Sequence, residues 1–290
     1  MARLEYQKQM LALLVLACSF TSLPSLAQVP ATLSVQERVQ RGKALFDEKC
    51  KTVAGEKIFK TVADVEGVLL LKLRPKAGER EWADPMWPGA AFAVEPTGED
   101  YLNTFLGAEI PLGHPPGSPY FGKPPSEEMR GSITPRALKD LRPIDRPGYR
   151  YVDVLDEKDG KRYRYTLVEK PRPASKIGWV DIVLDKIPAP DPVPRYAVTY
   201  EDQVVPEERA LLLASSKVKV IDRQTNEVLG EMTRYAWSAG APTSANPSPW
   251  LSAYSCPKSK GLSGYATRMF VDQVLIPAMP NPSINADAAR

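Results

Sequence analysis

The sequence predicts an α+β fold, built mainly on an antiparallel β-sheet of about eight strands with a few short helices. Strand-like runs follow one another through short turns, and helical patterns do not alternate with them. Asp159-Gly160, a strong hairpin signal, lies between two runs of alternating side chains at residues 149–155 and 161–168. Proline makes up 29 of the 290 residues, about twice the usual share, which disfavours long helices.

The other strands follow from similar patterns. Residues 217–222 and 227–235 predict a second hairpin, and residues 57–62 and 65–73 predict one near the N-terminus. Val68 to Leu71 are apolar on both faces, so this strand is expected in the middle of the sheet. Single strands are expected at residues 178–187, 195–200 and 269–276.

Helices are expected at the margins of the sheet. Ser34 and Glu37 fit a capping box, which predicts a helix running toward Cys50, although Gly42 weakens its middle by about 1 kcal/mol. Shorter helices are expected at residues 99–106, near Thr134, and at residues 206–214.

A proline-rich excursion interrupts these patterns at residues 74–148, where 13 of 75 residues are proline. Long irregular segments of this kind are usually functional or disordered. The excursion carries Trp82 and Trp87 beside carboxylates, in a setting where tryptophan can stack on a sugar or a proline-rich peptide. These two residues are the possible ligand contacts; the alternative is that they pin the excursion onto the sheet.

The N-terminus has the pattern of a secretory signal peptide, with a short basic segment, an apolar run and a small-residue cleavage site after Ala27. Residues 1–27 are therefore expected to be removed, leaving a single globular domain at 28–278 and a disordered tail at 279–290. The protein is expected to be periplasmic or secreted. Alternatively, Val15 to Cys18 act as a lipobox, and the protein is a lipoprotein anchored through Cys18.

Two cysteines, Cys50 and Cys256, remain in the mature chain. An even number of cysteines in an oxidising compartment predicts a disulfide between them. Two buried free thiols are the alternative.

Most catalytic signatures are missing from the sequence. The single histidine, His114, lies in a Pro/Gly loop, so neither a histidine-based triad nor a metal site is predicted, and no cofactor is expected. The net charge of +3 is too small to indicate a polyanionic partner, and nucleic acid is an improbable ligand for an exported protein. A membrane association is expected only if Cys18 is acylated.

Three stretches resemble a group of uncharacterised exported proteins of Gram-negative bacteria. They are Cys50…Ala54-Gly55-Glu56-Lys57-Ile58…Val65-Glu66-Gly67-Val68, Lys219-Val220-Ile221-Asp222…Glu227-Val228-Leu229-Gly230-Glu231, and Trp250…Cys256-Pro257. The resemblance implies export and a shared fold. It implies no catalytic residue, because the group has no assigned activity.

The functional expectation is a non-catalytic envelope or secreted protein that binds a protein partner or a cell-wall glycan through the excursion. The alternative is a periplasmic hydrolase that uses an Asp/Glu pair, which requires a cleft lined by two carboxyls with raised pKa values.

Overall fold

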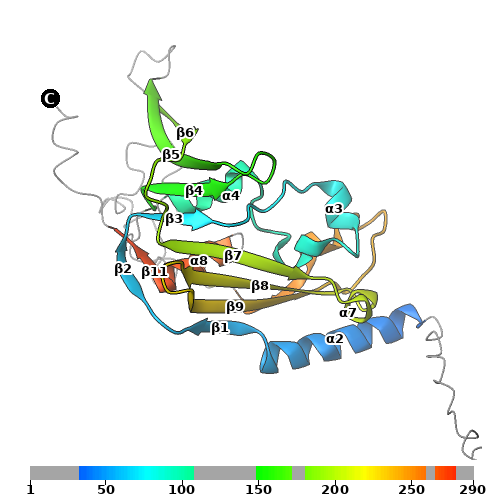
Figure 1. The fold of residues 1–290 in the computed structure, drawn as a ribbon. Helices are drawn as coiled ribbons and strands as arrows, with labels where there is room; N and C mark the ends of the chain where they lie inside the picture. The colour runs from blue at the N-terminus through cyan, green and yellow to red at the C-terminus, as the bar shows by residue number, and fades with distance from the viewer. Residues whose placement is uncertain (1–32, 108–147, 172–179, 259–264, 279–290) are drawn as a thin grey trace, which may run out of the picture. The chain divides into compact units, whose positions relative to one another are not determined.

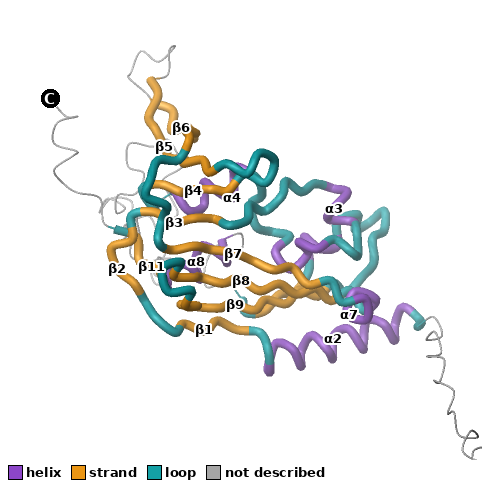
Figure 2. Tube along the Cα trace, viewed as in Figure 1, coloured by secondary structure: helices purple, strands orange, loops and turns teal. Residues whose placement is uncertain are grey.

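A nine-stranded, mixed but mostly antiparallel sheet with short helices forms the protein, as the sequence predicts (Figures 1 and 2). The structure is a computed structural model that describes residues 33–107, 148–171, 180–258 and 265–278. The described residues from 38 onward belong to one compact unit. The leader with Cys18, His114, the helix expected near Thr134 and the tail at 279–290 lie outside the described residues.

The sheet has the order β1-β9-β8-β7-β3-β4-β5-β6, and β10 also pairs with β9. Strands β2 and β11 form a separate parallel pair. The strands are β1 Gly55–Ile58, β2 Val62–Val65, β3 Gly67–Leu70, β4 Tyr151–Leu155, β5 Arg162–Pro171, β6 Val180–Pro188, β7 Tyr196–Gln203, β8 Leu213–Asp222, β9 Glu227–Trp237, β10 Tyr254–Cys256 and β11 Leu275–Pro277. The helices are α2 Val35–Thr52, α3 Glu79–Ala83, η1 Pro88–Phe92, α4 Glu99–Leu106, α7 Pro206–Ala210, η2 Pro249–Ser252 and α8 Ala266–Val274.

Both hairpins predicted from turn and alternation signals are confirmed. Strands β4 and β5 pair antiparallel, and Gly160 in their turn has φ +68°, a conformation that glycine adopts at no steric cost. Strands β8 and β9 also pair antiparallel, with Asn226 at φ +57° in the turn. Asparagine tolerates this region better than most residues do, so local chemistry explains both turns.

The hairpin predicted near the N-terminus is wrong. Strand β1 pairs with β9 at the edge of the sheet, whereas β3 lies in the middle, parallel to both β4 and β7 (Figure 1). The central position predicted for this apolar run is confirmed, since all four residues of β3 are buried. A strand that is apolar on both faces is typical of parallel pairing, and parallel neighbours cannot be joined by a tight turn.

The prediction of a last strand at residues 269–276 is also wrong. Most of it belongs to helix α8, and only Leu275–Pro277 form the short strand β11. Almost every residue of α8 is buried, including the polar Thr267, Arg268 and Asp272, and the predicted strand began only at Met269, after the first two of them. The helical spacing does appear in Arg268 and Asp272, whose Nε and Oδ1 atoms lie 2.6 Å apart in a buried i,i+4 ion pair.

The two faces of the sheet carry two separate apolar clusters. The main core includes Val218 and Met232 and lies under helices η1, α4 and α8. The second cluster lies on the opposite face, because Leu213, Tyr235 and Trp237 alternate with residues of the main core along β8 and β9. Helix α2 packs against this second cluster through Val39, Leu45 and Phe46.

The first part of the excursion belongs to the main core. Residues 74–107 fold into α3, η1 and α4, and Phe92, Tyr101 and Phe105 are each at most 2% exposed. The short helix expected at residues 99–106 is confirmed as α4. This part of the chain is therefore a packed cover for the sheet rather than an irregular loop that could be deleted without loss of the fold.

We expect Phe92→Ala to lower the free energy of unfolding by about 3–5 kcal/mol, because it removes a buried ring and leaves a cavity. Phe59→Ala is the matched control, since Phe59 is 58% exposed and its loss should cost less than about 0.5 kcal/mol. Urea unfolding followed by circular dichroism measures both. Equal effects of the two substitutions would contradict the assignment of η1 to the core.

Gly42 is the point of closest approach between α2 and the sheet. It is the one residue of α2 that is fully buried, and a Cβ atom there would lie 2.5 Å from Trp237 Nε1 and 2.7 Å from the carbonyl oxygen of Leu211. The carbonyl belongs to the backbone and cannot rotate away. Glycine thus weakens the helix locally, as the sequence indicates, but it is required by packing.

Gly42→Ala is accordingly expected to lower the free energy of unfolding by about 1–3 kcal/mol, although alanine favours helices. Lys43→Ala, on the exposed side of the same helix, should change it by less than about 0.5 kcal/mol. The same urea titration tests the pair, and a stabilised Gly42→Ala protein would contradict the close packing of α2.

Candidate functional site

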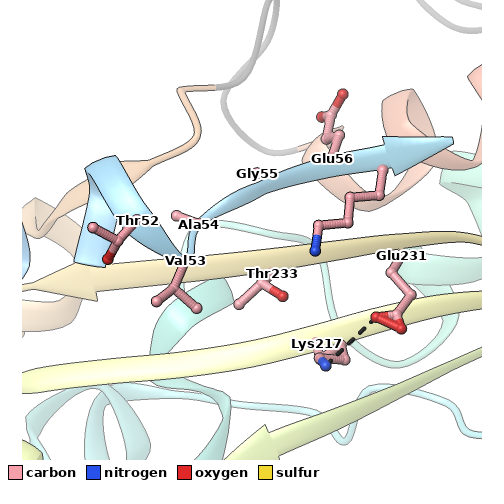
Figure 3. Close-up of a pocket in the computed structure, with 9 residues that line it drawn as sticks. Thr52, Val53, Ala54, Gly55, Glu56, Lys217, Glu231 and Thr233 are labelled. Carbon is pink, nitrogen blue, oxygen red and sulfur yellow. Dashed lines mark ion pairs between the residues drawn. The ribbon is translucent and has the colours of Figure 1, made fainter. Parts of the chain in front are cut away.

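A depression of about 370 Å³ opens where the end of α2 meets the outer face of the sheet (Figure 3). Its lining comes from the last turn of α2, from β1 and from the neighbouring strands β8 and β9. The lining residues are Thr52, Val53, Ala54, Gly55, Glu56, Lys57, Lys217, Glu231 and Thr233. The volume falls in the lower part of the range usual for small-molecule sites.

Local backbone geometry forms the α2 wall of this pocket. The N–H groups of Val53 and Ala54 both donate to the carbonyl oxygen of Lys49, at 2.9 and 2.8 Å, which ends the helix and turns the chain into β1. Gly55 follows with φ +153°, a backbone conformation open to glycine. The chain therefore passes from helix to edge strand within three residues and encloses the pocket on one side.

Strand alternation positions the charged wall. Lys217, Glu231 and Thr233 point to the same face of the sheet, and Lys57 stands opposite Glu231 in the β1–β9 register. Lys217 Nζ and Glu231 Oε2 lie 3.5 Å apart, the contact drawn as a dashed line in Figure 3. Within the described part of the chain, Lys57 has no ion-pair partner. The wall thus offers one paired and one unpaired ammonium group.

The fourth charged lining residue, Glu56, is directed elsewhere. Its neighbours on β1 face the pocket, so its own side chain points to the other side of the strand, and Oε2 accepts a hydrogen bond from Gln273 Nε2 at 2.9 Å. Figure 3 shows Glu56 on the side of β1 away from Lys217 and Glu231. The charges that face the pocket therefore sum to about one positive charge.

The predicted disulfide between Cys50 and Cys256 is confirmed, and it adjoins the pocket. It joins the last turn of α2 to β10, with a Cα–Cα distance of 5.7 Å. Cys256 stands opposite Tyr235 on β9, the strand that also carries Glu231 and Thr233. The disulfide thus links the α2 wall covalently to β10, and β10 is paired with the strand that forms the other wall.

A charged cluster, formed by Arg74, Glu95 and Asp202, is buried beneath the opposite face of the sheet. Arg74 is 3% exposed, and its guanidinium lies 3.3 Å from Glu95 Oε2 and 3.5 Å from Asp202 Oδ1. It also lies over the rings of Phe92 and Tyr200, 4.1 and 4.2 Å from their centroids. A guanidinium between two carboxylates and two rings is well suited to burial.

Glu95 joins this cluster to helix α8. Thr267 donates to its carboxylate through the backbone N–H and through Oγ1, the latter at 2.8 Å. Burial raises the pKa of the Glu95 carboxyl, and Arg74 and both hydrogen bonds from Thr267 act against that rise. The carboxylate therefore fixes the start of α8 against the segment before α4.

The hydrolase alternative requires two carboxyls that face a cleft. In this cluster Glu95 and Asp202 are bridged by Arg74, and Asp202 also accepts a hydrogen bond from Ser216 Oγ at 2.6 Å. Both carboxylates are engaged by groups of the protein itself, so the cluster has the character of a structural network. It gives the hydrolase alternative no support.

The structure places the two predicted ligand contacts apart from the pocket. Trp82 and Trp87 are half-buried and pack against the main core, and the ring of Trp87 covers Gly89. The pocket lies on the other face of the sheet, next to the second cluster. This packing matches the structural alternative for the two residues, and a role in ligand contact stays a prediction.

Within the described ranges, no group of three or more His, Cys, Asp or Glu side chains could hold a metal ion. No helix among these residues is long and apolar enough to cross a membrane. No family model, curated protein or solved structure matches the chain.

The pocket residues were missed by sequence reasoning, although a signal for them exists. In the predicted hairpin at residues 217–235, alternation places Lys217 and Lys219 on one face, but Glu231 reaches that face only because the register shifts between Val220 and Ile221. The contribution of Lys57 depends on β1 pairing with β9, two segments far apart in the sequence. No local pattern indicates that pairing.

We expect Arg74→Met to lower the free energy of unfolding by about 3–5 kcal/mol, because it leaves Glu95 buried without its cation. Arg150→Ala is the control: Arg150 and Glu66 form an ion pair at 2.6 Å, but both side chains are about half exposed. Its loss should cost less than about 1 kcal/mol. Thermal and urea unfolding distinguish the two, and a similar small effect for both would refute the structural role of the cluster.

Proposed function

We propose that this chain is exported through a cleaved leader, residues 1–27, and acts outside the cytoplasm as a non-catalytic protein that binds a carboxylate-bearing cell-wall glycan. The observation that carries the proposal is the pocket at the end of α2, which presents the unpaired Lys57 beside the Lys217–Glu231 pair. Export is supported by the leader pattern and by the Cys50–Cys256 disulfide, since disulfides persist in oxidising compartments.

The chemistry of the pocket favours a polar, anionic ligand. An ammonium group without a carboxylate partner attracts anions, and Thr52, Thr233 and Glu231 add groups that can donate or accept hydrogen bonds. Peptidoglycan fragments carry sugar hydroxyls, amides and peptide carboxylates, which are groups that such a surface can bind. An apolar ligand would find few partners here, because charged and hydroxyl side chains make up much of the lining.

The test is the affinity of purified soluble muropeptides for the mature protein and its variants, measured by isothermal titration calorimetry. Lys57→Ala and Lys217→Ala are each expected to weaken binding about tenfold, because each removes an ammonium group from the pocket. Lys219→Ala is the matched control, since Lys219 is two residues from Lys217 on the same strand and face but does not line the pocket. Higher salt should weaken the binding of the wild-type protein.

Two results would overturn the proposal. Wild-type protein that does not bind muropeptides has no such site, and an equal loss with Lys219→Ala would mean that only general surface charge attracts the ligand. Crosslinking in the native envelope addresses the protein-partner alternative. A protein that is captured in a Lys57-dependent way, with no affinity for muropeptides, would identify a protein ligand instead.

A further inference from the structure

We infer that the Cys50–Cys256 disulfide controls the shape of the pocket, so that ligand capture depends on the redox state of these two cysteines. The inference rests on the proposed function, because it concerns the same pocket. Its basis is the short connection between the disulfide and both pocket walls. Thr52, Val53 and Ala54 follow Cys50 within four residues, and Cys256 is paired with the strand that forms the other wall.

The α2 wall has no independent support of comparable strength. Val53 and Ala54 are bound to Lys49 within the same turn, so the wall moves with the end of the helix. An ion pair between Lys49 Nζ and Glu208 Oε1 connects this turn to α7, but the two atoms lie 4.0 Å apart. Phe46 stacks on Trp237 at a centroid distance of 6.1 Å, one turn before Cys50. The disulfide is the direct covalent connection at the position of the wall.

Besides the disulfide, the last turn of α2 is held by partly buried contacts with the second cluster and by the pairing of β1 with β9, which begins only at Gly55. The residues of α2 are mostly exposed, and among them only Gly42 is fully buried. In proteins, most of the stability of a helix comes from the packing of its apolar face. Once the disulfide is open, the last turn of α2 is expected to fray, and residues 52–54 then leave the position that closes the pocket.

Reduction of this bond is an ordinary thiol–disulfide exchange. A thiolate of a dithiol donor attacks one sulfur of the disulfide, and the other cysteine leaves as a thiolate and is protonated. The second thiol of the donor then resolves the mixed disulfide. Two electrons and two protons pass to Cys50 and Cys256, and the donor becomes a disulfide. Both cysteines are half-buried, so neither belongs to the fully buried core.

The effect is expected to stay local. The main core lies on the other face of the sheet and includes neither cysteine. Helices α4 and α8 pack within that core. Opening the disulfide should therefore release the end of α2 and leave the sheet, α4 and α8 folded.

The experiment compares the oxidised protein, the protein reduced with dithiothreitol and the Cys50→Ser/Cys256→Ser variant. Hydrogen–deuterium exchange read by mass spectrometry should show protection at residues 45–58 reduced at least tenfold in the two open forms. Residues 99–106 and 266–274 should stay folded and remain the best protected segments of the two open forms, although the lost loop closure lowers their protection as well. Muropeptide affinity should fall about tenfold on reduction and return on reoxidation. The Ser variant should bind as weakly as the reduced protein, with or without dithiothreitol.

The outcomes separate this inference from the proposed function. If the oxidised protein binds muropeptides and the reduced protein binds them equally well, the redox control is wrong and the binding function stands. If the oxidised protein does not bind them, the proposed function fails, and the inference about ligand capture fails with it. A reduced protein in which residues 99–106 and 266–274 exchange as fast as an unfolded chain would also overturn the inference, because the core itself would then need the disulfide to fold.

Discussion

Alternation of side chains along β8 and β9 is the constraint on which the rest of the structure depends. Val218 and Met232 point into the main core, whereas Lys217 and Glu231 point to the opposite face. A shift of one residue in either strand would exchange the two sets, so the register is fixed by burial. The same alternation places Trp237 under α2 and thereby brings the end of that helix to the charged pocket.

Parallel pairing of β3 explains the excursion that follows it. Strand β4 lies beside β3 and runs in the same direction, so the chain must return across the sheet before β4 can form. The intervening segment includes α3, η1 and α4, which cover the main core. The composition of this segment indicates an irregular loop. At least in residues 74–107, however, the segment is the crossover that makes a central parallel strand possible.

Local signals predicted much of this fold, and non-local pairings account for what was missed. Gly160 marks a turn between adjacent strands, so the β4–β5 hairpin can be read from a few residues. The disulfide was predictable because the two cysteines outside the predicted leader leave one pairing. The partners of β3 and the ion pairs of Arg74 join distant segments, and nothing near Arg74 in the sequence indicates Glu95 or Asp202.

The disulfide lies where few buried residues hold the helix against the sheet. The second cluster has three fully buried members, Leu213, Tyr235 and Trp237, and it must hold an 18-residue helix against the sheet. Closing a loop across a sequence separation of 206 residues stabilises the fold by about 5 kcal/mol on the chain-entropy model. That contribution acts on the whole protein, but its local effect falls on the last turn of α2.

Segments of low local stability are where binding and conformational change are coupled most easily. A pocket at this boundary can therefore respond to a single covalent bond, whereas a site within the main core would open only when the core itself unfolds.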